Sequence, residues 1–164
     1  MKLNLGCCDA ILPDHVNVDV VAGPGVDVVA DLRQPWPWED GSVLEVRAFD
    51  VIEHLPSHIH TMNEMWRVLR AGGVAKIAVP TTDGTGAFQD PTHVSFWNRR
   101  SFLYYEAGNI YRERFARSYG IRAAFRVLWE HTTPTIDGLA WRSTSRRSRA
   151  DSSLPASRFD SWAC

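Results

Sequence analysis

The spacing of the first strand signals limits what this chain can fold into. Three short apolar segments near the amino terminus read as β-strands, over residues 2–5, 16–21 and 26–30. Only nine residues separate Gly6 from Val16, and eleven separate Asp19 from Asp31. A crossover between parallel strands needs about 10–12 residues when it includes a helix. The first two connections are therefore expected to be loops or single helical turns.

The rest of the chain alternates strand and helix signals. Further strands are expected over residues 43–51, 74–79 and 121–131. Ser57 is suited to cap a helix whose apolar face repeats at spacings of three and four, at Ile59, Met62, Trp66 and Leu69. We expect Gly72-Gly73 to end this helix, and Asn98 to cap a second one that Gly108 ends. This alternation predicts an α/β, Rossmann-like, mostly parallel sheet with trimmed first crossovers.

The composition changes near residue 139. Residues 141–164 contain five arginines, seven serines and a single leucine, without strand or helix periodicity. Such a segment buries too little apolar surface to offset its ordering entropy. We therefore expect one domain over residues 1–139 and a disordered tail over 140–164. The sheet would then lack its last strand, which leaves an incomplete C-terminal edge.

Charge and composition exclude several classes of protein. Hydrophobic residues make up 45% of the chain, which is typical of a globular domain, and charges interrupt every apolar run before a membrane span is reached. Three cysteines and no apolar signal core favour a cytoplasmic protein. Residues 1–98 have a net charge of −7 and residues 99–164 of +6. Because no aromatic-interleaved basic motif accompanies the arginines, we expect them to be solvated and expect no nucleic acid partner.

Four features in a fixed order carry a resemblance to a known family. They are Gly6-Cys7-Cys8 after the first strand, Asp19 near the end of the second, Asp31-Leu32 twelve residues later, and Phe49-Asp50-Val51-Ile52-Glu53-His54-Leu55 before a helix that closes with Trp66-Arg67-Val68-Leu69-Arg70-Ala71-Gly72-Gly73. Over residues 2–105 the chain resembles the class I S-adenosylmethionine-dependent methyltransferases, in particular the small-molecule subgroup called type 11. Each motif is weak alone, and their order is what makes the resemblance specific.

The resemblance implies S-adenosylmethionine as cofactor and six residues around it: Gly6 and Cys7 near the methionine part, Asp19 on the ribose, Asp31 and Leu32 near the adenine, and Asp50 beside the reactive methyl. Ligands of open α/β sheets bind outside the carboxyl ends of the strands, and the acidic N-terminal part suits a cationic sulfonium. The chain departs from the family's Gly-Cys-Gly at Cys8. Because a cysteine adopts positive φ less easily than glycine, we expect strain there. Trp36 and Trp38 are expected to form a hydrophobic plug rather than a shield for the adenine.

The segment from Gln89 to Asn98 concentrates acid, imidazole, hydroxyl and indole groups after a strand. His93 is a candidate general base, with Asp90 as the other candidate catalytic residue. An equally weighted alternative is that Asp90 and His93 stabilise the loop through a hydrogen bond. His54, His58 and His60 lack convergent spacing, so we expect no metal site and interpret Glu53-His54 as support for the active site.

The sequence therefore predicts methyl transfer from S-adenosylmethionine to a small-molecule acceptor through an O, N or C nucleophile. One alternative is a non-catalytic methyltransferase relic that binds the cofactor or serves as a scaffold, suggested by Cys8, the short C-terminus and the tail. An NAD-dependent dehydrogenase is disfavoured because the spaced glycines that hold a pyrophosphate are absent. The oligomeric state is left open.

Overall fold

A seven-stranded sheet organises the chain in the computed structural model, which describes residues 1–132 and 136–143. The strands are β1 (Lys2–Leu5), β2 (Val16–Asp19), β3 (Val28–Val29), β4 (Val43–Phe49), β5 (Leu69–Pro80), β6 (Phe125–Thr132) and β7 (Ile136–Ser143). The helices are α1 (His58–Val68), α2 (Gly86–Gln89) and α3 (Ile110–Tyr119), with 3₁₀ segments η1 (Ile52–His54) and η2 (Arg99–Tyr105). None of the helices in these described ranges is long and apolar enough to cross a membrane.

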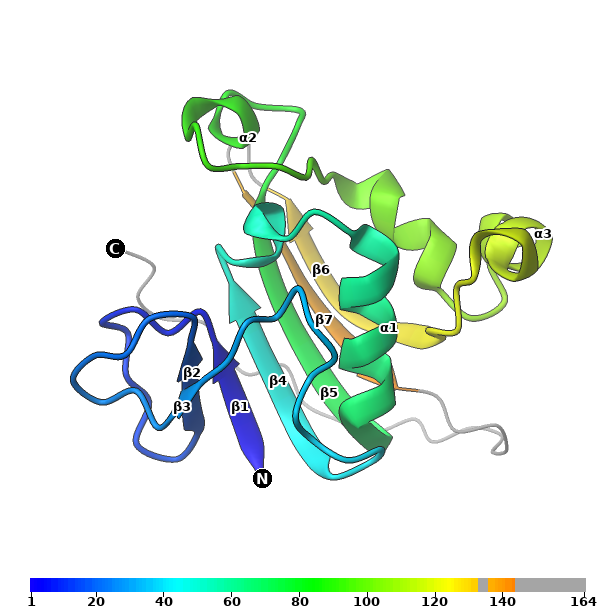
Figure 1. The fold of residues 1–164 in the computed structure, drawn as a ribbon. Helices are drawn as coiled ribbons and strands as arrows, with labels where there is room; N and C mark the ends of the chain where they lie inside the picture. Colours follow the sequence, from blue (N-terminus) through cyan, green and yellow to red (C-terminus); the bar gives the residue numbers. More distant parts are fainter. Residues whose placement is uncertain (133–135, 144–164) are drawn as a thin grey trace.

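The strand order is β3-β2-β1-β4-β5-β7-β6 (Figure 1). Neighbouring strands from β3 to β5 are parallel, and β7 is antiparallel to both β5 and β6. The chain first moves outward from β1 to β3 and then returns to place β4 on the other side of β1. The predicted Rossmann-like, mostly parallel sheet is therefore confirmed, and its topological switch point lies between β1 and β4.

The expected incomplete edge is wrong. Residues 136–143 form β7, which pairs with β5 from Val74 to Pro80 and with β6 over most of its length. The strand also continues past the domain boundary expected at residue 139. A strand flanked on both sides needs no amphipathic alternation to be held by backbone hydrogen bonds, which is why the periodicity gave no signal for it. The remainder of the expected tail, residues 144–164, lies outside the described residues.

The first crossovers contain no helix anywhere in the described segment from residue 6 to residue 42, as the spacing predicted. Two buried amides hold the loop between β1 and β2. Asn4 donates to the carbonyl of Ala10 at 2.8 Å and to the Asn17 side chain at 3.0 Å. Asn17 in turn accepts from the amide of Leu12 at 2.9 Å. A helix satisfies its own backbone groups, whereas this loop depends on side chains for the same purpose.

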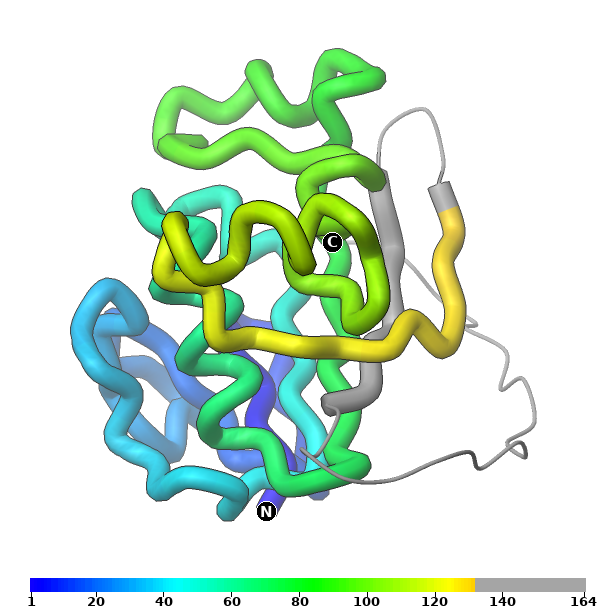
Figure 2. Tube along the Cα trace, turned by 90° about the vertical axis from the view of Figure 1, so that its right-hand side faces the viewer, coloured from blue at the N-terminus to red at the C-terminus, as the bar shows by residue number. Residues whose placement is uncertain are grey.

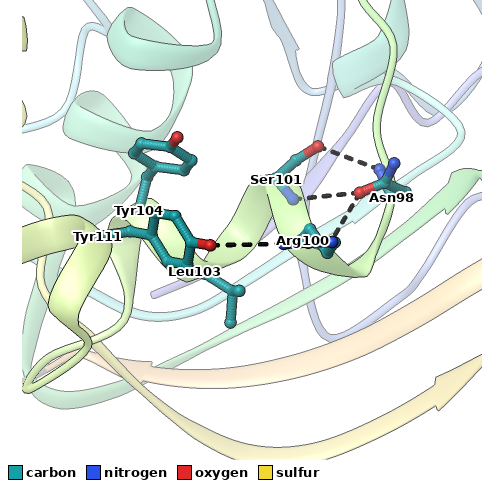
Figure 3. Close-up of a pocket in the computed structure, with 6 residues that line it drawn as sticks. All are labelled: Asn98, Arg100, Ser101, Leu103, Tyr104 and Tyr111. Carbon is teal, nitrogen blue, oxygen red and sulfur yellow. Dashed lines mark hydrogen bonds between the residues drawn. The ribbon is translucent and has the colours of Figure 1, made fainter.

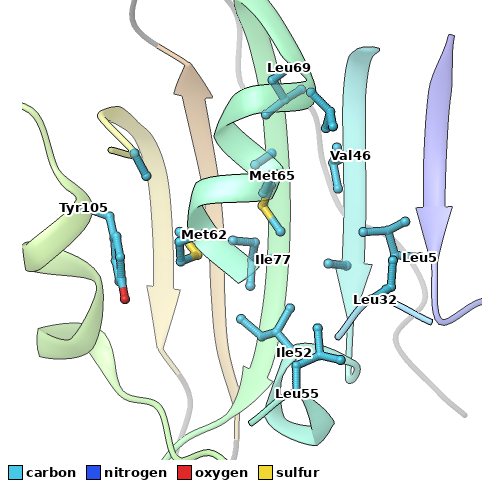
Figure 4. Packing of buried hydrophobic residues seen from close by; sticks show 14 of the residues in the cluster. Leu5, Leu32, Val46, Ile52, Leu55, Met62, Met65, Leu69, Ile77 and Tyr105 are labelled. Carbon is cyan, nitrogen blue, oxygen red and sulfur yellow. The ribbon is translucent and has the colours of Figure 1, made fainter. Parts of the chain in front are cut away.

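The apolar core lies between the sheet and α1. In Figure 1 α1 stands in front of the sheet, and Figure 2 shows α1 and the loop of residues 30–42 on the same side of the strands. Met62 and Met65 of α1 face Ile77 of β5 and Val46 of β4 (Figure 4), and all four side chains are at least 99% buried. In a β-strand every second side chain points to the same face of the sheet. Val46 and Ile77 belong to such alternating sets, so one face of the sheet lines this core.

The other face of the same strands is polar. Asn17, Asn4, Arg47 and Lys76 stand opposite one another across β2, β1, β4 and β5. Arg47 donates to the Asn4 side chain at 2.8 Å, and Lys76 donates to Glu45 at 2.8 Å. The alternation of apolar and polar residues thus gives these parallel strands one apolar and one polar face, unlike parallel strands buried on both faces.

The expected helices occur with different ends. Ser57 caps α1 by accepting from the His60 amide, as predicted, but the helix ends at Val68 and β5 starts at Leu69, before the glycine pair. Asn98 caps η2, a 3₁₀ segment rather than an α-helix. Helix α3 was not predicted; its signals were Asn109 as N-cap and Gly120 in the left-handed conformation as C-cap.

The loop of residues 30–42 takes the place of a crossover helix and is fastened to α1 by two charged residues. The buried carboxylate of Glu64 accepts from the Trp36 amide at 2.8 Å. Arg67 donates to the carbonyls of Trp36 and Trp38 and forms an ion pair with Glu64 at 2.7 Å. Trp36 is 3% exposed and lies in the core, so the predicted hydrophobic plug is confirmed for this residue.

We expect Arg67→Ala to destabilise the protein strongly, because it leaves the Glu64 carboxylate and two backbone carbonyls without their donor. Breaking one side of a buried ion pair costs about 3 kcal/mol or more, which corresponds to a fall of roughly 6–12 °C in Tm for a domain of this size. Arg33→Ala, which breaks the more exposed Arg33–Asp31 pair, is the matched control and should change Tm little. Calorimetric Tm values that fall equally in both variants would contradict this role of Arg67.

Candidate functional site

The carboxyl ends of the parallel strands bring most of the predicted site residues to one edge of the sheet. Gly6 follows β1, Asp19 ends β2, Asp31 follows β3 and Asp50 follows β4. Because β1 and β4 are neighbours whose outgoing connections diverge, Gly6 and Asp50 lie at the switch point. This edge is therefore where a ligand of this fold is expected.

Gly6 allows the turn after β1 to pass against the turn after β4. Its φ is +59°, and a Cβ at this position would lie 2.5 Å from Cγ2 of Val51. Any other residue would collide with Val51 and would also strain the backbone. The conformation of Gly6 thus allows the two turns to touch at the switch point.

Asp19 holds the loop that follows Gly6. Its carboxylate accepts from the Cys8 amide at 2.9 Å and from the Val21 amide at 3.1 Å. Cys8 has a φ of +44°, so the strain expected from a cysteine in place of glycine is present. Cys7 is buried, and burial and the nearby Asp19 raise the pKa of its thiol, which therefore stays protonated and unreactive.

The residues predicted near an adenine have local partners. Both carboxylate oxygens of Asp31 accept from the Arg33 guanidinium, at 2.8 and 3.0 Å, and this pairing lowers the pKa of Asp31. The Leu32 side chain is buried in the core, and its carbonyl accepts from the Trp36 indole at 3.1 Å. Asp31 therefore reaches the edge as one half of an ion pair, and Leu32 contributes to the wall beneath it.

Asp50 occupies a left-handed turn with a φ of +52° directly after β4. The residue is in contact with solvent, yet surrounding protein atoms displace enough water from its carboxyl group to raise its pKa. Arg47, His54 and His93 oppose this shift through their charges. Asp50 is thus electrostatically linked to the histidines described next.

Glu53 is a buried acidic residue at this edge whose carboxyl group has no hydrogen-bond partner. The residue is 2% exposed, and neither of its carboxyl oxygens has a hydrogen-bond partner. Its backbone carbonyl accepts from the amides of Val94 and Ser95, both at 2.9 Å. These bonds fix the loop after α2 against η1, so that the buried carboxyl group lies beneath the loop that carries His93.

His54 and His93 meet above Glu53. Their ring centroids lie 4.9 Å apart, and one ligand atom from each of Glu53, His54 and His93 lies within 4.8 Å of the other two. His93 Nδ1 lies 3.0 Å from the carbonyl oxygen of Ala87, and His54 Nδ1 lies 3.3 Å from that of Thr92. A carbonyl can only accept, so Nδ1 of each ring is the donor, and Nε2 is the acceptor nitrogen of the neutral ring.

Asp90 does not pair with the His93 side chain. It accepts from the amide and the hydroxyl of Thr92, at 2.7 and 2.6 Å, and these bonds lower its pKa. The hydrogen bond that joins Asp90 and His93 runs from the His93 amide to the Asp90 carbonyl, at 3.2 Å, and the Asp90 side chain stabilises the loop through Thr92. Glu53 and His54 lie beside His93. The spacing of the histidines along the chain had related His54 only to His58 and His60. The sequence did not predict the contact between His54 and His93, because the loop after α2 returns to η1 from 39 residues away.

Two hollows lie near this edge. One of about 470 Å³ is lined by Pro56, Ser57, His58, Ile59, Val94, Ser95 and Phe96, next to the loop of His93. A second of about 260 Å³ lies between η2 and α3, lined by the residues that Figure 3 labels. In the second hollow Arg100 donates to the Tyr111 hydroxyl at 3.4 Å and Asn98 caps η2. Val94, which follows His93 in the chain, lines the first hollow.

Comparison with known proteins shows which domain and which folds the chain is similar to. Residues 4–77 match a family model described as a methyltransferase domain, and no curated protein matches the chain. A methyltransferase from Archaeoglobus fulgidus that depends on S-adenosylmethionine superposes with a TM-score of 0.59 and 13% identity, covering 86% of this chain and 85% of that one. The 1,6-didemethyltoxoflavin-N1-methyltransferase of Burkholderia thailandensis gives a TM-score of 0.59 and 13% identity, covering 88% and 71%.

A 16S rRNA (adenine(1408)-N(1))-methyltransferase from Catenulisporales acidiphilia also shares the fold, with a TM-score of 0.55 and 12% identity, covering 90% of this chain and 86% of that one. At such identities these structures are informative about the fold alone. The family match, however, spans the segment that contains Gly6, Asp19, Asp31 and Asp50. Residues 4–77 are therefore similar to a methyltransferase domain, and the chain shares the fold of S-adenosylmethionine-dependent methyltransferases.

Proposed function

We propose that this methyltransferase transfers the methyl group of S-adenosylmethionine to a small molecule bound beside His93. The observation that carries the proposal is the placement of Asp19 and Asp50 at the carboxyl ends of β2 and β4, with His93 close enough to Asp50 to act on its carboxyl group. When bound, S-adenosylmethionine supplies a methyl group on a positively charged sulfur. Carboxylates at the end of the strands suit this charge and the ribose hydroxyls of the cofactor.

The residues of the edge fit the cofactor unequally. Asp19 uses its two oxygens on backbone amides, but each carboxylate oxygen has a second lone pair that can accept from a ribose hydroxyl. Asp50 is open to solvent and offers a carboxylate at the switch point. Cys7 and Leu32 have buried side chains, so we expect them to contribute backbone groups and wall rather than side-chain contacts. Asp31 remains available as an ion pair with Arg33.

The acceptor side is defined by the loop that carries His93. Phe88 and Phe96 stack at 5.1 Å, and their exposed fractions are 64% and 45%. Exposed stacked rings beside the 470 Å³ hollow favour a small acceptor with an apolar part. An RNA acceptor, as in the structurally similar rRNA methyltransferase, would instead need a basic surface here, and this loop carries Asp90 but no lysine or arginine.

His93 is the proposed proton acceptor, and Glu53 is not. Burial raises the pKa of Glu53 to about 8, so it holds its proton at neutral pH. The bond from His93 Nδ1 to the Ala87 carbonyl orients the ring and leaves Nε2 as the acceptor nitrogen of the neutral imidazole. Catalysis would rest mainly on alignment of the acceptor nucleophile with the methyl group, and proton removal by His93 would accompany attack by a hydroxyl.

The alternative of a non-catalytic relic is favoured by one feature, the strained Cys8. The expectation that the last strand is absent does not support this alternative, because β7 is present. Incubation with labelled S-adenosylmethionine and a panel of acceptors separates the two, since a relic binds the cofactor without labelling any acceptor. Mass spectrometry of ligands that co-purify with the chain identifies the cofactor independently of the acceptor.

We expect Asp19→Ala to weaken binding of S-adenosylhomocysteine by about 3 kcal/mol, roughly 100-fold in Kd, because two hydrogen bonds to a carboxylate are lost. Titration calorimetry gives the affinity. Asp14→Ala is the control, since Asp14 pairs with Lys2 at the opposite edge of the sheet. Asp19→Asn, which keeps one acceptor oxygen for the Cys8 amide, should lie between the two. Wild-type affinity in Asp19→Ala would overturn the assignment of this site.

We expect Glu53→Gln to gain stability relative to the wild type as pH rises. The measurement uses protein treated with a chelator, so that no metal ion acts on Glu53. The folded state then holds the Glu53 proton up to about pH 8, whereas the unfolded chain releases it near pH 4.5. The wild type therefore loses stability between these values, and the uncharged glutamine does not. Differential scanning calorimetry should show the Tm difference between variant and wild type becoming more positive from pH 5 to pH 8.

Glu64→Gln is the control for this measurement. Hydrogen bonds from Arg67 lower the pKa of Glu64 below 4.5, so its contribution is already complete at pH 5 and lost only at lower pH. The Tm difference for Glu64→Gln should therefore stay constant from pH 5 to pH 8. The same constancy for Glu53→Gln would mean that Glu53 is ionised in the folded protein.

A further inference from the structure

We propose that Glu53, His54 and His93 form a binding site for one divalent transition-metal cation of the zinc class. The three side chains come from η1 and from the loop after α2, and they are the group in the described part of the chain whose ligand atoms all lie within 4.8 Å of one another. Two imidazole nitrogens and one carboxylate oxygen are a ligand set that zinc and similar cations accept.

The distances are compatible with such a cation after a small closure. Zinc lies about 2.0–2.2 Å from nitrogen and oxygen ligands, which places ligand atoms roughly 3.2–3.5 Å apart in a tetrahedral site. The ligand atoms start at separations of up to 4.8 Å. Side-chain rotations of His54 and His93, both of which are partly exposed, can supply the remaining approach while Glu53 stays fixed.

The state of Glu53 is the second observation that points to a ligand. A carboxyl group that is 2% exposed and has no hydrogen-bond partner for either oxygen is costly to bury. The acidic side chains of Asp50 and Asp90 act on it electrostatically and make this cost higher. A bound cation would satisfy the carboxylate and offset the acidic surroundings.

The histidines already have the outer contacts of metal ligands. Metal-binding imidazoles usually donate their second ring N–H to a carbonyl or carboxylate, which fixes the tautomer and the ring orientation. His93 donates from Nδ1 to Ala87, and His54 donates from Nδ1 to Thr92. The Thr92 hydroxyl in turn donates to Asp90 at 2.6 Å. These bonds use Nδ1 of both rings and leave Nε2 for a cation.

The consequence for catalysis rests on the proposed function and deepens it. Three protein ligands leave a position for an acceptor oxygen, and a bound cation lowers the pKa of that oxygen. The acceptor hydroxyl then releases its proton to solvent, its oxygen bonds to the methyl carbon, and the carbon–sulfur electron pair leaves with sulfur. His93 acts as ligand in this state and as proton acceptor only without the cation. The acceptor class is therefore a hydroxyl compound.

Binding of Zn²⁺ and Co²⁺ to the chelator-treated full chain tests the site without any activity measurement. Titration calorimetry should give one Zn²⁺ per chain at this site, and Co²⁺ should develop visible absorption from nitrogen coordination. Glu53→Gln, His54→Gln and His93→Gln should each weaken binding by more than the roughly 10–100-fold that loss of an outer partner costs. His60→Gln is the matched control, because His60 bonds to the Gln34 carbonyl outside the cluster.

The outcomes separate this proposal from the proposed function. Equal cation affinity in the wild type and the three cluster variants, or equal loss in His60→Gln, would overturn the metal site. Circular dichroism of each variant verifies folding, and the three independent variants keep the test valid if one of them unfolds. Affinity for S-adenosylhomocysteine measured in chelator should be unchanged in His60→Gln, which lies outside the cluster. Loss of cofactor binding in the wild type itself would instead count against the methyltransferase proposal.

Discussion

Connections too short to hold a helix are the constraint on which the rest of this structure depends. Between β1 and β4, loops do what crossover helices do in larger sheets of this class, and loops cannot satisfy their own backbone groups. Buried side chains therefore take over that task. Asn4 and Asn17 hold the first loop, and Glu64 with Arg67 holds the tryptophan loop. Because these connections contain no helix, the strands have one apolar face and one polar face.

The candidate site inherits this dependence. Asp19 fixes the turn after β1 through the Cys8 amide, and in the proposed function its remaining lone pairs bind the cofactor. Gly6 brings that turn against Val51, beside Asp50. Because structural and ligand-binding tasks fall on the same residues, the functional and the loop-stabilising interpretations of Asp19 are compatible rather than exclusive.

The part of the edge near His93 is organised differently, around a buried acid. The amides of Val94 and Ser95 bind the Glu53 carbonyl, and this pairing brings the His93 loop onto η1. The carboxyl group itself has no partner in return. A protein that buries a carboxyl group without satisfying it has lost stability at that position, and such losses are concentrated at functional sites.

The sequence by itself determined the class of the fold and the first half of the site. Short β-branched runs, their spacing and the glycine and aspartates at strand ends specify which residues reach the carboxyl edge, because that placement follows from local strand geometry and parallel pairing. Tertiary structure alone decided the rest. Residues 136–143 become a strand because both neighbours offer backbone partners, and Glu53, His54 and His93 meet because a loop from distant residues bonds to η1. Both outcomes depend on contacts between segments far apart in the chain, which no local pattern encodes.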